Sequence, residues 1–306
     1  MKIDDVKYVR VLLTNRCNLS CIFCHREGCD YNSKDIDKNI LLDTIKNLYN
    51  IGYRKVKLMG GEPMLYKKLE SVICAIKSIG DDIDLSMISN GSAPTIKYMK
   101  TFELGLNRLN FSVHGWEYEY FKKNTGASID IWKVIRKNIV WLAKEKRISK
   151  LNYVLKKGEK ENDFFKLIEF AKDYNLIIDA LNLILTPDCK AMGNLQYEFE
   201  EIEKLIQEKY VIVESYEFNN IYSLPSKRIV LDNGVIINLK TNKLREQRIF
   251  SSCNECLYKN ECIEGIKAIR ITNNALIQPC LLRTDNVLNL KSVACEKEII
   301  EYLRNL

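Results

Sequence analysis

The sequence predicts an α/β protein built from six strand–helix units. From Tyr8 to about Leu185, short apolar runs alternate with longer segments whose apolar residues recur every three or four positions. The strand candidates are Val9–Leu13, Lys55–Met59, Leu85–Ile88, Leu109–Val113, Leu151–Leu155 and Ile177–Leu183. Repeated units of this kind favour a parallel sheet with helices outside it. Because six units are too few for a full eight-unit barrel, we expect an open, partial (β/α)6 barrel.

Four segments between these strands have the spacing of helices that bury one face. Their apolar residues recur at three- and four-residue intervals, which places them on one side of a helix. The stripes consist of Leu41, Ile45 and Leu48; Leu65, Leu69, Val72, Ile73 and Ile76; Ile131, Ile135, Ile139 and Leu142; and Phe164, Leu167, Ile168 and Ala171. Gly52 and Gly80 follow the first two stripes, where glycine commonly ends a helix.

The composition predicts a folded protein in a reducing compartment. Of the 306 residues, 46% are hydrophobic and 28% are charged, which is typical of soluble globular proteins. No run of about 18 apolar residues predicts a membrane-spanning helix, and the first residues lack a signal-peptide pattern. We therefore expect a cytoplasmic protein with no membrane partner. Eleven cysteines in such a chain favour metal or redox chemistry over disulfides.

The formal net charge of +7 comes from lysines and arginines that are spread along the chain. Charge distributed in this way is most often a solvated surface, and it also suits a small anionic substrate. The basic residues are not interleaved with aromatic ones as single-stranded nucleic acid binding requires. We therefore expect no nucleic acid partner.

Three cysteines directly after the first strand candidate form the strongest candidate site. Cys17, Cys21 and Cys24 have the spacing C-x3-C-x2-C within the segment Thr14–His25. Three thiolates from one short loop can hold three corners of a cubic iron–sulfur cluster, which leaves the fourth iron open for a ligand. Zinc sites more commonly show paired C-x2-C or C-x2-C…H-x3-H spacing. Zinc binding and purely structural thiols remain the alternatives.

A second candidate site follows the second strand, in the run Gly60, Gly61, Glu62 and Pro63. Two glycines at a strand end allow the backbone to approach a ligand closely. The proline restricts Glu62 to an extended conformation, so its carboxylate is well placed to bind an ammonium group. The alternative is an ordinary turn from a strand into a helix.

Polar residues also follow the later strands of the predicted sheet. They are Ser89-Asn90-Gly91 after the third, Ser112-Val113-His114-Gly115 at the fourth and Lys156-Lys157-Gly158 after the fifth. In parallel barrels the chemistry gathers at the C-terminal ends of the strands, so we expect one site at this edge. His25 and His114, the two histidines of the chain, adjoin these segments and are candidates for hydrogen bonds within the site.

The pattern changes after Leu185, and we place a domain boundary between about Leu185 and Gln196. This gives a barrel core over residues 1–190 and a C-terminal region over 191–306. Asp232-Asn233-Gly234 lies between two apolar runs and predicts a β-hairpin. A further hairpin is expected from Ala268–Thr272 and Leu276–Gln278.

The C-terminal region carries a second group of cysteines. Cys253, Cys256 and Cys262 are followed by Cys280 at the end of the later hairpin. Four thiols are a complete ligand set for an iron–sulfur cluster or for zinc. The remaining cysteines, which have no partner at ligand spacing, are expected to be ordinary thiols: Cys29, Cys74, Cys189 and Cys295.

The cysteine triplet and the Gly-Gly-Glu-Pro run together resemble the signatures of the radical S-adenosylmethionine (SAM) superfamily. The resemblance implies a TIM-like partial barrel and a 4Fe–4S cluster whose open iron binds SAM. Reductive cleavage of SAM would then yield a 5′-deoxyadenosyl radical that abstracts a substrate hydrogen. It further implies an electron donor such as flavodoxin or ferredoxin. The residues that match SAM-contacting positions of the family are Gly60, Gly61, Glu62, Pro63, Ser89, Ser112 and Asn152.

Further matches extend over most of the chain and resemble the archaeal-type branch of GTP 3′,8-cyclase, which acts in molybdenum cofactor biosynthesis. They include Cys24-His25-Arg26-Glu27-Gly28 and the late run Ala268-Ile269-Arg270-Ile271-Thr272. The basic residues that match the nucleotide site of that family are Arg10, Lys55, Lys57, Lys157 and Arg270. The chain departs from the family at Asp179, where an arginine is expected on the sixth strand, and at Ala268. It also lacks the C-terminal Gly-Gly tail.

Three hypotheses follow. The first is a GTP 3′,8-cyclase-like enzyme. The second is a radical enzyme of the SPASM/twitch type that modifies a peptide or another small molecule, because Cys253, Cys256 and Cys262 resemble the spacing of the auxiliary cluster in those enzymes. In both, the second cysteine group would hold a second 4Fe–4S cluster. The third is a non-catalytic protein that binds a metal cluster or zinc.

Overall fold

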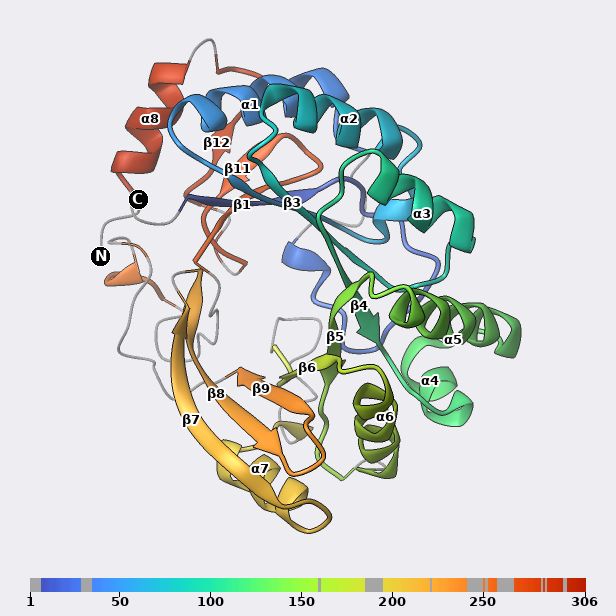
Figure 1. Ribbon diagram of the computed structural model, residues 1–306. Helices are drawn as coiled ribbons and strands as arrows, with labels where there is room; N and C mark the ends of the chain where they lie inside the picture. Colours follow the sequence, from blue (N-terminus) through green and yellow to red (C-terminus); the bar gives the residue numbers. More distant parts are fainter. Residues whose placement is uncertain are drawn as a thin grey trace.

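All strands in the described part of the chain form one sheet, which curves into an open barrel (Figure 1). The computed structural model describes residues 7–28, 35–158, 161–184, 195–220, 222–240, 250, 253–257, 267–281, 283, 285–293 and 296–306. The predictions on Cys29, Cys189, Cys262 and Cys295 lie outside these residues, as does most of the predicted domain boundary. In the described part, no helix is both long and apolar enough to cross a membrane.

The predicted six-stranded parallel sheet is confirmed. It consists of β1 (Tyr8–Leu12), β2 (Lys55–Met59), β3 (Asp84–Ser89), β4 (Arg108–Val113), β5 (Ile148–Val154) and β6 (Ile177–Leu181), which are neighbours in sequence order. Every adjacent pair is parallel. The sheet does not close, because further strands extend it at both edges.

Helices cover the convex side of the sheet. They are α1 (Lys38–Asn50), α2 (Leu69–Ile79), α3 (Thr95–Glu103), α4 (Tyr118–Thr125), α5 (Ile129–Lys144) and α6 (Glu161–Asp173). Asp37 caps α1 by accepting hydrogen bonds from the backbone amides of Asn39 and Ile40. The apolar stripes predicted α1, α2, α5 and α6, but not α3. That helix buries only Tyr98 and Thr101, so it has no apolar stripe to recognise.

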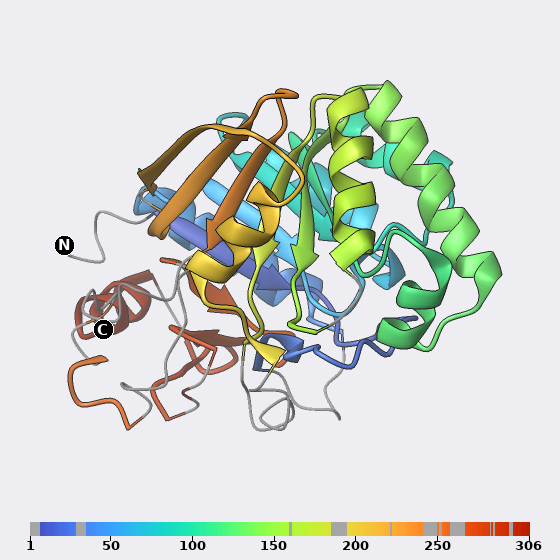
Figure 2. The same ribbon diagram turned by 90° about the horizontal axis from the view of Figure 1, so that it is seen from below.

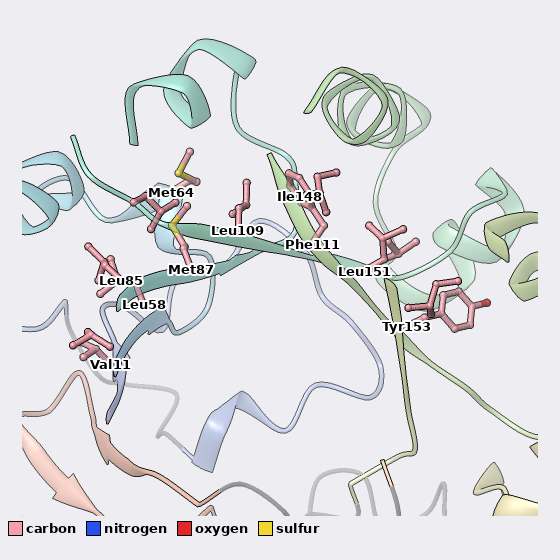
Figure 3. Packing of buried hydrophobic residues seen from close by; sticks show 14 of the residues in the cluster. Val11, Leu58, Met64, Leu85, Met87, Leu109, Phe111, Ile148, Leu151 and Tyr153 are labelled. Carbon is pink, nitrogen blue, oxygen red and sulfur yellow. The ribbon is translucent and has the colours of Figure 1, made fainter. Parts of the chain in front are cut away.

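The core lies between the sheet and these helices. Val11, Leu58, Met87, Leu109 and Ile148 occupy matching positions on β1 to β5 and form a continuous row. All five are buried, and Figure 3 shows them following one another along the sheet. Because successive residues of a strand point to opposite faces, the residues next to this row face the concave side.

The C-terminal region extends the sheet at both edges. On one side β10 (Ile269–Ile271) runs parallel to β1 and is followed by β11 (Leu276–Gln278) and β12 (Leu288–Asn289). On the other side β9 (Ile236–Lys240) runs parallel to β6 and continues into β8 (Ser223–Leu231) and β7 (Ile212–Asn220). Both predicted hairpins are confirmed. A separate C-terminal domain stays a prediction.

The last two helices flank these additions. α7 (Phe199–Gln207) lies against β7 and β8, where Glu203 accepts a hydrogen bond from Ser215 and pairs with Lys227 (Figures 1 and 2). α8 (Glu296–Arg304) lies beside α1 and contacts it through Glu296 and Asn50.

Candidate functional site

The loop that carries the first cysteines is fixed to the end of α4 by backbone hydrogen bonds. It runs from Cys17 to Cys24, beyond the C-terminal end of β1. Within it, the amides of Ser20 and Ile22 donate to the carbonyls of Thr125 and Asn124 at 3.1 and 2.9 Å. The loop therefore has a defined position above the concave face before any ligand binds.

The three thiols lie close enough for each to affect the ionisation of the others. Burial raises the pKa of Cys21 strongly, and the charges of Cys24 and Cys17 raise it further. Burial also raises the pKa of Cys17. Thiolate repulsion of this kind is relieved when a positively charged metal centre replaces the protons. This donor set fits a ligand that takes all three thiolates.

The spacing of these thiols is compatible with a cluster. Among the described residues, no three His, Cys, Asp or Glu side chains are grouped closely enough to hold a single metal ion. A 4Fe–4S cluster has a different requirement, because each cysteine sulfur binds a separate iron and the sulfurs therefore lie further apart.

Gly60 and Gly61 allow the end of β2 to pack directly against the cysteine loop. Gly61 and Glu62 donate backbone hydrogen bonds to the carbonyls of Thr14 and Arg16 at 2.7 and 2.8 Å. A Cβ atom on Gly60 would lie 2.3 Å from the Thr14 oxygen, and one on Gly61 would lie 2.2 Å from the Arg16 oxygen. Gly60 also has a φ of 138°, which side chains rarely adopt.

A Gly61→Ala variant is therefore expected to displace the cysteine loop and to lose most of its iron after anaerobic reconstitution. The added methyl group meets backbone atoms that cannot move independently of the loop. Gly158→Ala is a useful control, because a Cβ atom there meets nothing within 4 Å. Equal iron content in the two variants would contradict this role for Gly61.

Glu62 connects the ends of β2 and β3. It is 1% exposed, and its carboxylate accepts hydrogen bonds from the Ser89 hydroxyl at 2.8 Å and from the amides of Asn90 and Met64 at 2.7 and 3.0 Å. Burial raises the pKa of Glu62 to about 7 although these three bonds oppose the shift. Pro63 begins the short helix η3 (Pro63–Leu65). The contact of Glu62 with an ammonium group stays a prediction.

Asn90 extends this connection to the first cysteine. Its side-chain amide donates to the Asn18 side chain at 3.0 Å and lies 3.8 Å from the Cys17 sulfur. Three strand ends are therefore joined around the cysteine loop: β1 through the loop itself, β2 through Glu62 and β3 through Asn90 and Ser89.

Ser112 and Asn152 are brought together on adjacent strands. They occupy matching positions on β4 and β5, and both are half-buried. Asp179 occupies the matching position on β6. Beyond Ser112, the His114 ring lies 5.4 Å from the Phe23 ring of the cysteine loop. Burial lowers the pKa of His114 to about 4, so the ring is neutral at pH 7.

The concave face presents a row of basic side chains. Arg270, Arg10 and Lys57 occupy matching positions on β10, β1 and β2, and Arg108 follows across Ser86 on β4. Other basic residues on this face are Lys55, Lys150 and Lys240. The acidic residues of the same strands that face this side, Asp84 and Asp179, pair with some of them.

The lysines of this row are poorly accommodated as cations. Burial lowers the pKa of Lys57 to about 7, and the charges of Arg10 and Arg108 lower it further. Burial likewise lowers the pKa of Lys55 to about 8. A polyanion bound here would offset the mutual repulsion and restore the charged form of both side chains.

Lys157 lies apart from this row. Its ammonium group pairs with Glu201 on α7, and both side chains are partly exposed. The neighbouring Lys156 is buried instead, where it donates to the Asn124 side chain and lies 5.3 Å from the Phe23 ring. The structure thus places Lys156, rather than Lys157, against the cysteine loop.

The described cysteines of the second group gather near Arg283. The charges of Cys256 and Cys280 both raise the pKa of this guanidinium, after the larger effect of its hydrogen bond to Asp285. Cys253 and Cys256 are linked by a backbone hydrogen bond of 3.3 Å. Cys280 follows Pro279, whose carbonyl accepts from Arg270 at 3.4 Å. The second group therefore adjoins one end of the basic row.

Sequence reasoning did not assign roles to Glu27, Asn124 or Lys156. The charges of these polar residues are buried, so periodicity gives no signal for them, and their partners are distant in sequence. Glu27 has one usable signal, because it stands three residues after the last cysteine of the triplet.

An open parallel barrel with a cysteine triplet beyond its first strand defines a class of α/β enzymes that hold an iron–sulfur cluster. A family model described as the radical SAM superfamily matches residues 11–171. The chain belongs to the radical SAM superfamily. Membership implies a 4Fe–4S cluster and SAM as cofactors, as the sequence predicted.

Curated relatives resemble almost the whole chain. A probable GTP 3′,8-cyclase of Sulfurisphaera tokodaii is 31% identical over 294 residues, which cover 94% of this chain and 85% of the relative. A probable GTP 3′,8-cyclase of Pyrococcus horikoshii is 26% identical over 98% of this chain and 92% of its own length.

Solved structures of low identity share the fold. SuiB of Streptococcus suis bound to S-adenosylmethionine has a TM-score of 0.62 at 14% identity, and the match covers 95% of this chain and 64% of SuiB. The enzyme anSMEcpe with bound AdoMet has a TM-score of 0.62 at 13% identity, over 97% of this chain and 81% of that one.

Proposed function

We propose that this radical SAM enzyme acts on a nucleoside triphosphate as a GTP 3′,8-cyclase, in molybdenum cofactor biosynthesis. The observation that carries the proposal is the row of Arg270, Arg10 and Lys57 on the concave face, below the cysteine loop. Guanidinium groups bind phosphate with paired hydrogen bonds, and ammonium groups bind it as point charges. The names of the curated relatives support the same substrate.

In this proposal Cys17, Cys21 and Cys24 each hold one iron of a 4Fe–4S cluster. When bound, the cluster and SAM supply a 5′-deoxyadenosyl radical, which would remove the 3′ hydrogen of the ribose before C3′ joins guanine C8. The chain itself positions the reactants and excludes water. The residues proposed to contact SAM are Gly60, Gly61, Glu62, Pro63, Ser89, Ser112 and Asn152.

The phosphates would lie on Arg10, Lys55, Lys57 and Arg270. Arg10 and Arg270 are buried and adjacent, so they can act together on one phosphate group. Lys157 would have to leave Glu201 to join them. Its exchange of an exposed ion pair for a phosphate costs little, because exposed pairs contribute about 1 kcal/mol or less.

A second 4Fe–4S cluster is proposed on Cys253, Cys256 and Cys280, with Cys262 as a further ligand. The shared neighbourhood of Cys256 and Cys280 at Arg283 supports this assignment. Reduction of the first cluster requires a one-electron donor of low potential, for which flavodoxin or ferredoxin is suited.

A second candidate function is supported by Asp179. This acid lies on the concave face, where it accepts hydrogen bonds from Lys150 at 3.1 Å and from Asn238 at 2.7 Å. Its charge reduces the positive potential on β5 and β6, where the family has an arginine. A twitch-type enzyme that acts on a peptide or another small molecule would place fewer demands on that potential.

Incubation of the reconstituted protein with SAM, dithionite and GTP tests the first proposal. We expect 3′,8-cyclised product by mass spectrometry, together with 5′-deoxyadenosine that depends on GTP. ATP serves as the control nucleotide, because it carries the same triphosphate on another base. SAM cleavage without any GTP-dependent product would favour the peptide or small-molecule substrate.

A further inference from the structure

Two of the proposed phosphate-binding arginines already share an anion that belongs to the chain. The Glu27 carboxylate lies 2.9 Å from Nη2 of Arg10 through one oxygen and 3.4 Å from Nε of Arg270 through the other. All three residues are at least nine-tenths buried. The carboxylate thus bridges two guanidinium groups on adjacent strands, which is the arrangement that a phosphate group would make.

This carboxylate does not come from the sheet. Glu27 is in the short helix η2 (Arg26–Gly28), which follows the cysteine loop and lies on the concave side as the blue turn near the centre of Figure 1. Arg26 and Glu27 have φ values of 49° and 51°, which cost energy for residues other than glycine. The Glu27 amide donates to Nδ1 of His25 at 3.1 Å, which holds this turn in place.

We propose that Glu27 is an internal competitor for the phosphate site and thereby a determinant of substrate specificity. The inference rests on the proposed function. Arg10 and Arg270 cannot give the same hydrogen bonds to Glu27 and to a phosphate. A ligand must therefore displace the Glu27 carboxylate before it can bind both arginines.

Protonation does not remove the competitor at working pH. Burial alone would raise the pKa of Glu27, but the charges of Arg10, His25 and Arg270 outweigh this effect and lower it to about 2. The carboxylate is therefore ionised throughout the neutral range, and displacement means exchanging one anion for another.

This exchange discriminates between ligands by charge. A single phosphate replaces the Glu27 contacts and gains little beyond them. A triphosphate also reaches Lys57, which neighbours Arg10 on β2, and Lys55 at the same edge, so it gains contacts that Glu27 does not make. Competition by Glu27 therefore selects for a ligand with several adjacent negative charges.

The proposal is tested by calorimetric titration of inorganic tripolyphosphate into the anaerobically reconstituted Glu27→Gln variant and the wild type. Glutamine keeps the size of the side chain and removes its charge. If most molecules hold Glu27 on the arginines, the variant is expected to bind tripolyphosphate about tenfold more tightly, because the competitor no longer reduces the binding-competent fraction. Inorganic phosphate is expected to gain at least as much, so that the preference for tripolyphosphate falls.

Glu70→Gln is the matched control, since Glu70 is an exposed acid on α2, on the outer side of the barrel. It should leave both affinities unchanged. Equal or weaker tripolyphosphate binding in Glu27→Gln would overturn the proposal and leave Glu27 as a structural counter-ion for two buried arginines.

Carboxyl labelling of the wild type keeps the proposal testable if the variant does not fold. A water-soluble carbodiimide with glycine ethyl ester should modify Glu27 weakly in the free protein and several-fold more in the presence of tripolyphosphate. Unchanged or reduced labelling would overturn the proposal. The GTP assay is independent of these results: tighter tripolyphosphate binding without GTP product would retain the competitor and reject the cyclase activity.

Discussion

Replacing Cys21 by alanine is expected to abolish the cleavage of SAM. Cys21 lies between the other two thiols of the triplet, and its side chain interacts electrostatically with both. Two thiolates leave two irons of a four-iron cluster without protein ligands, so the cluster is lost or cannot bind SAM productively. Methionine and 5′-deoxyadenosine, measured after reduction with dithionite under anaerobic conditions, should fall to background.

The chain provides a matched control in Cys74. This thiol is exposed on α2, on the helical side of the barrel, and lies away from both cysteine groups in sequence. Cys74→Ala should retain full cleavage and the full iron content. Cleavage that persists in Cys21→Ala would show that the triplet has been assigned incorrectly.

A different result is expected for Cys256→Ala. Its thiol belongs to the C-terminal group near Arg283 and not to the cysteine loop. SAM cleavage should survive, product formation should stop, and the iron content should fall from about eight to about four atoms per chain. An unchanged iron content would remove the second cluster from the proposal and leave the first one intact.

The sequence predicted the parallel sheet well because its strands are short and buried on one face. Lys55–Met59 was predicted with the bounds that β2 has, and Gly60 marked its end. The hairpin at Asp232-Asn233-Gly234 was equally accessible, since Gly234 has the positive φ of 85° that such turns require. These signals are local and need no knowledge of distant contacts.

The basic row was only partly predictable. Arg10, Lys57 and Arg270 were proposed from resemblance, but their alignment depends on the pairing of β10 with β1, between residues about 260 positions apart. Neither periodicity nor turn chemistry specifies such a register. Lys157 was expected in the same group and lies with Glu201 instead, because α7 follows from the C-terminal region and carries that acid.

The pH dependence of anion binding should reveal Lys57. Because the pKa of Lys57 is lowered to about 7 in the free protein, its ammonium group is largely charged at pH 6 and largely neutral at pH 8. Binding of tripolyphosphate favours the charged form, so affinity should fall as pH rises through 7. Above that pH, binding should take up protons, which calorimetry in buffers of different ionisation enthalpy measures directly.

Lys57→Arg separates this effect from the titration of the phosphates. A guanidinium group stays protonated over the whole range, so the variant should bind at pH 8 about tenfold more tightly, relative to pH 6, than the wild type does. The phosphates themselves gain charge as pH rises, and this contribution is the same in both proteins. Identical pH profiles would mean that Lys57 does not meet the anion, and the phosphates would then have to lie on the arginines alone, where Glu27 competes most directly.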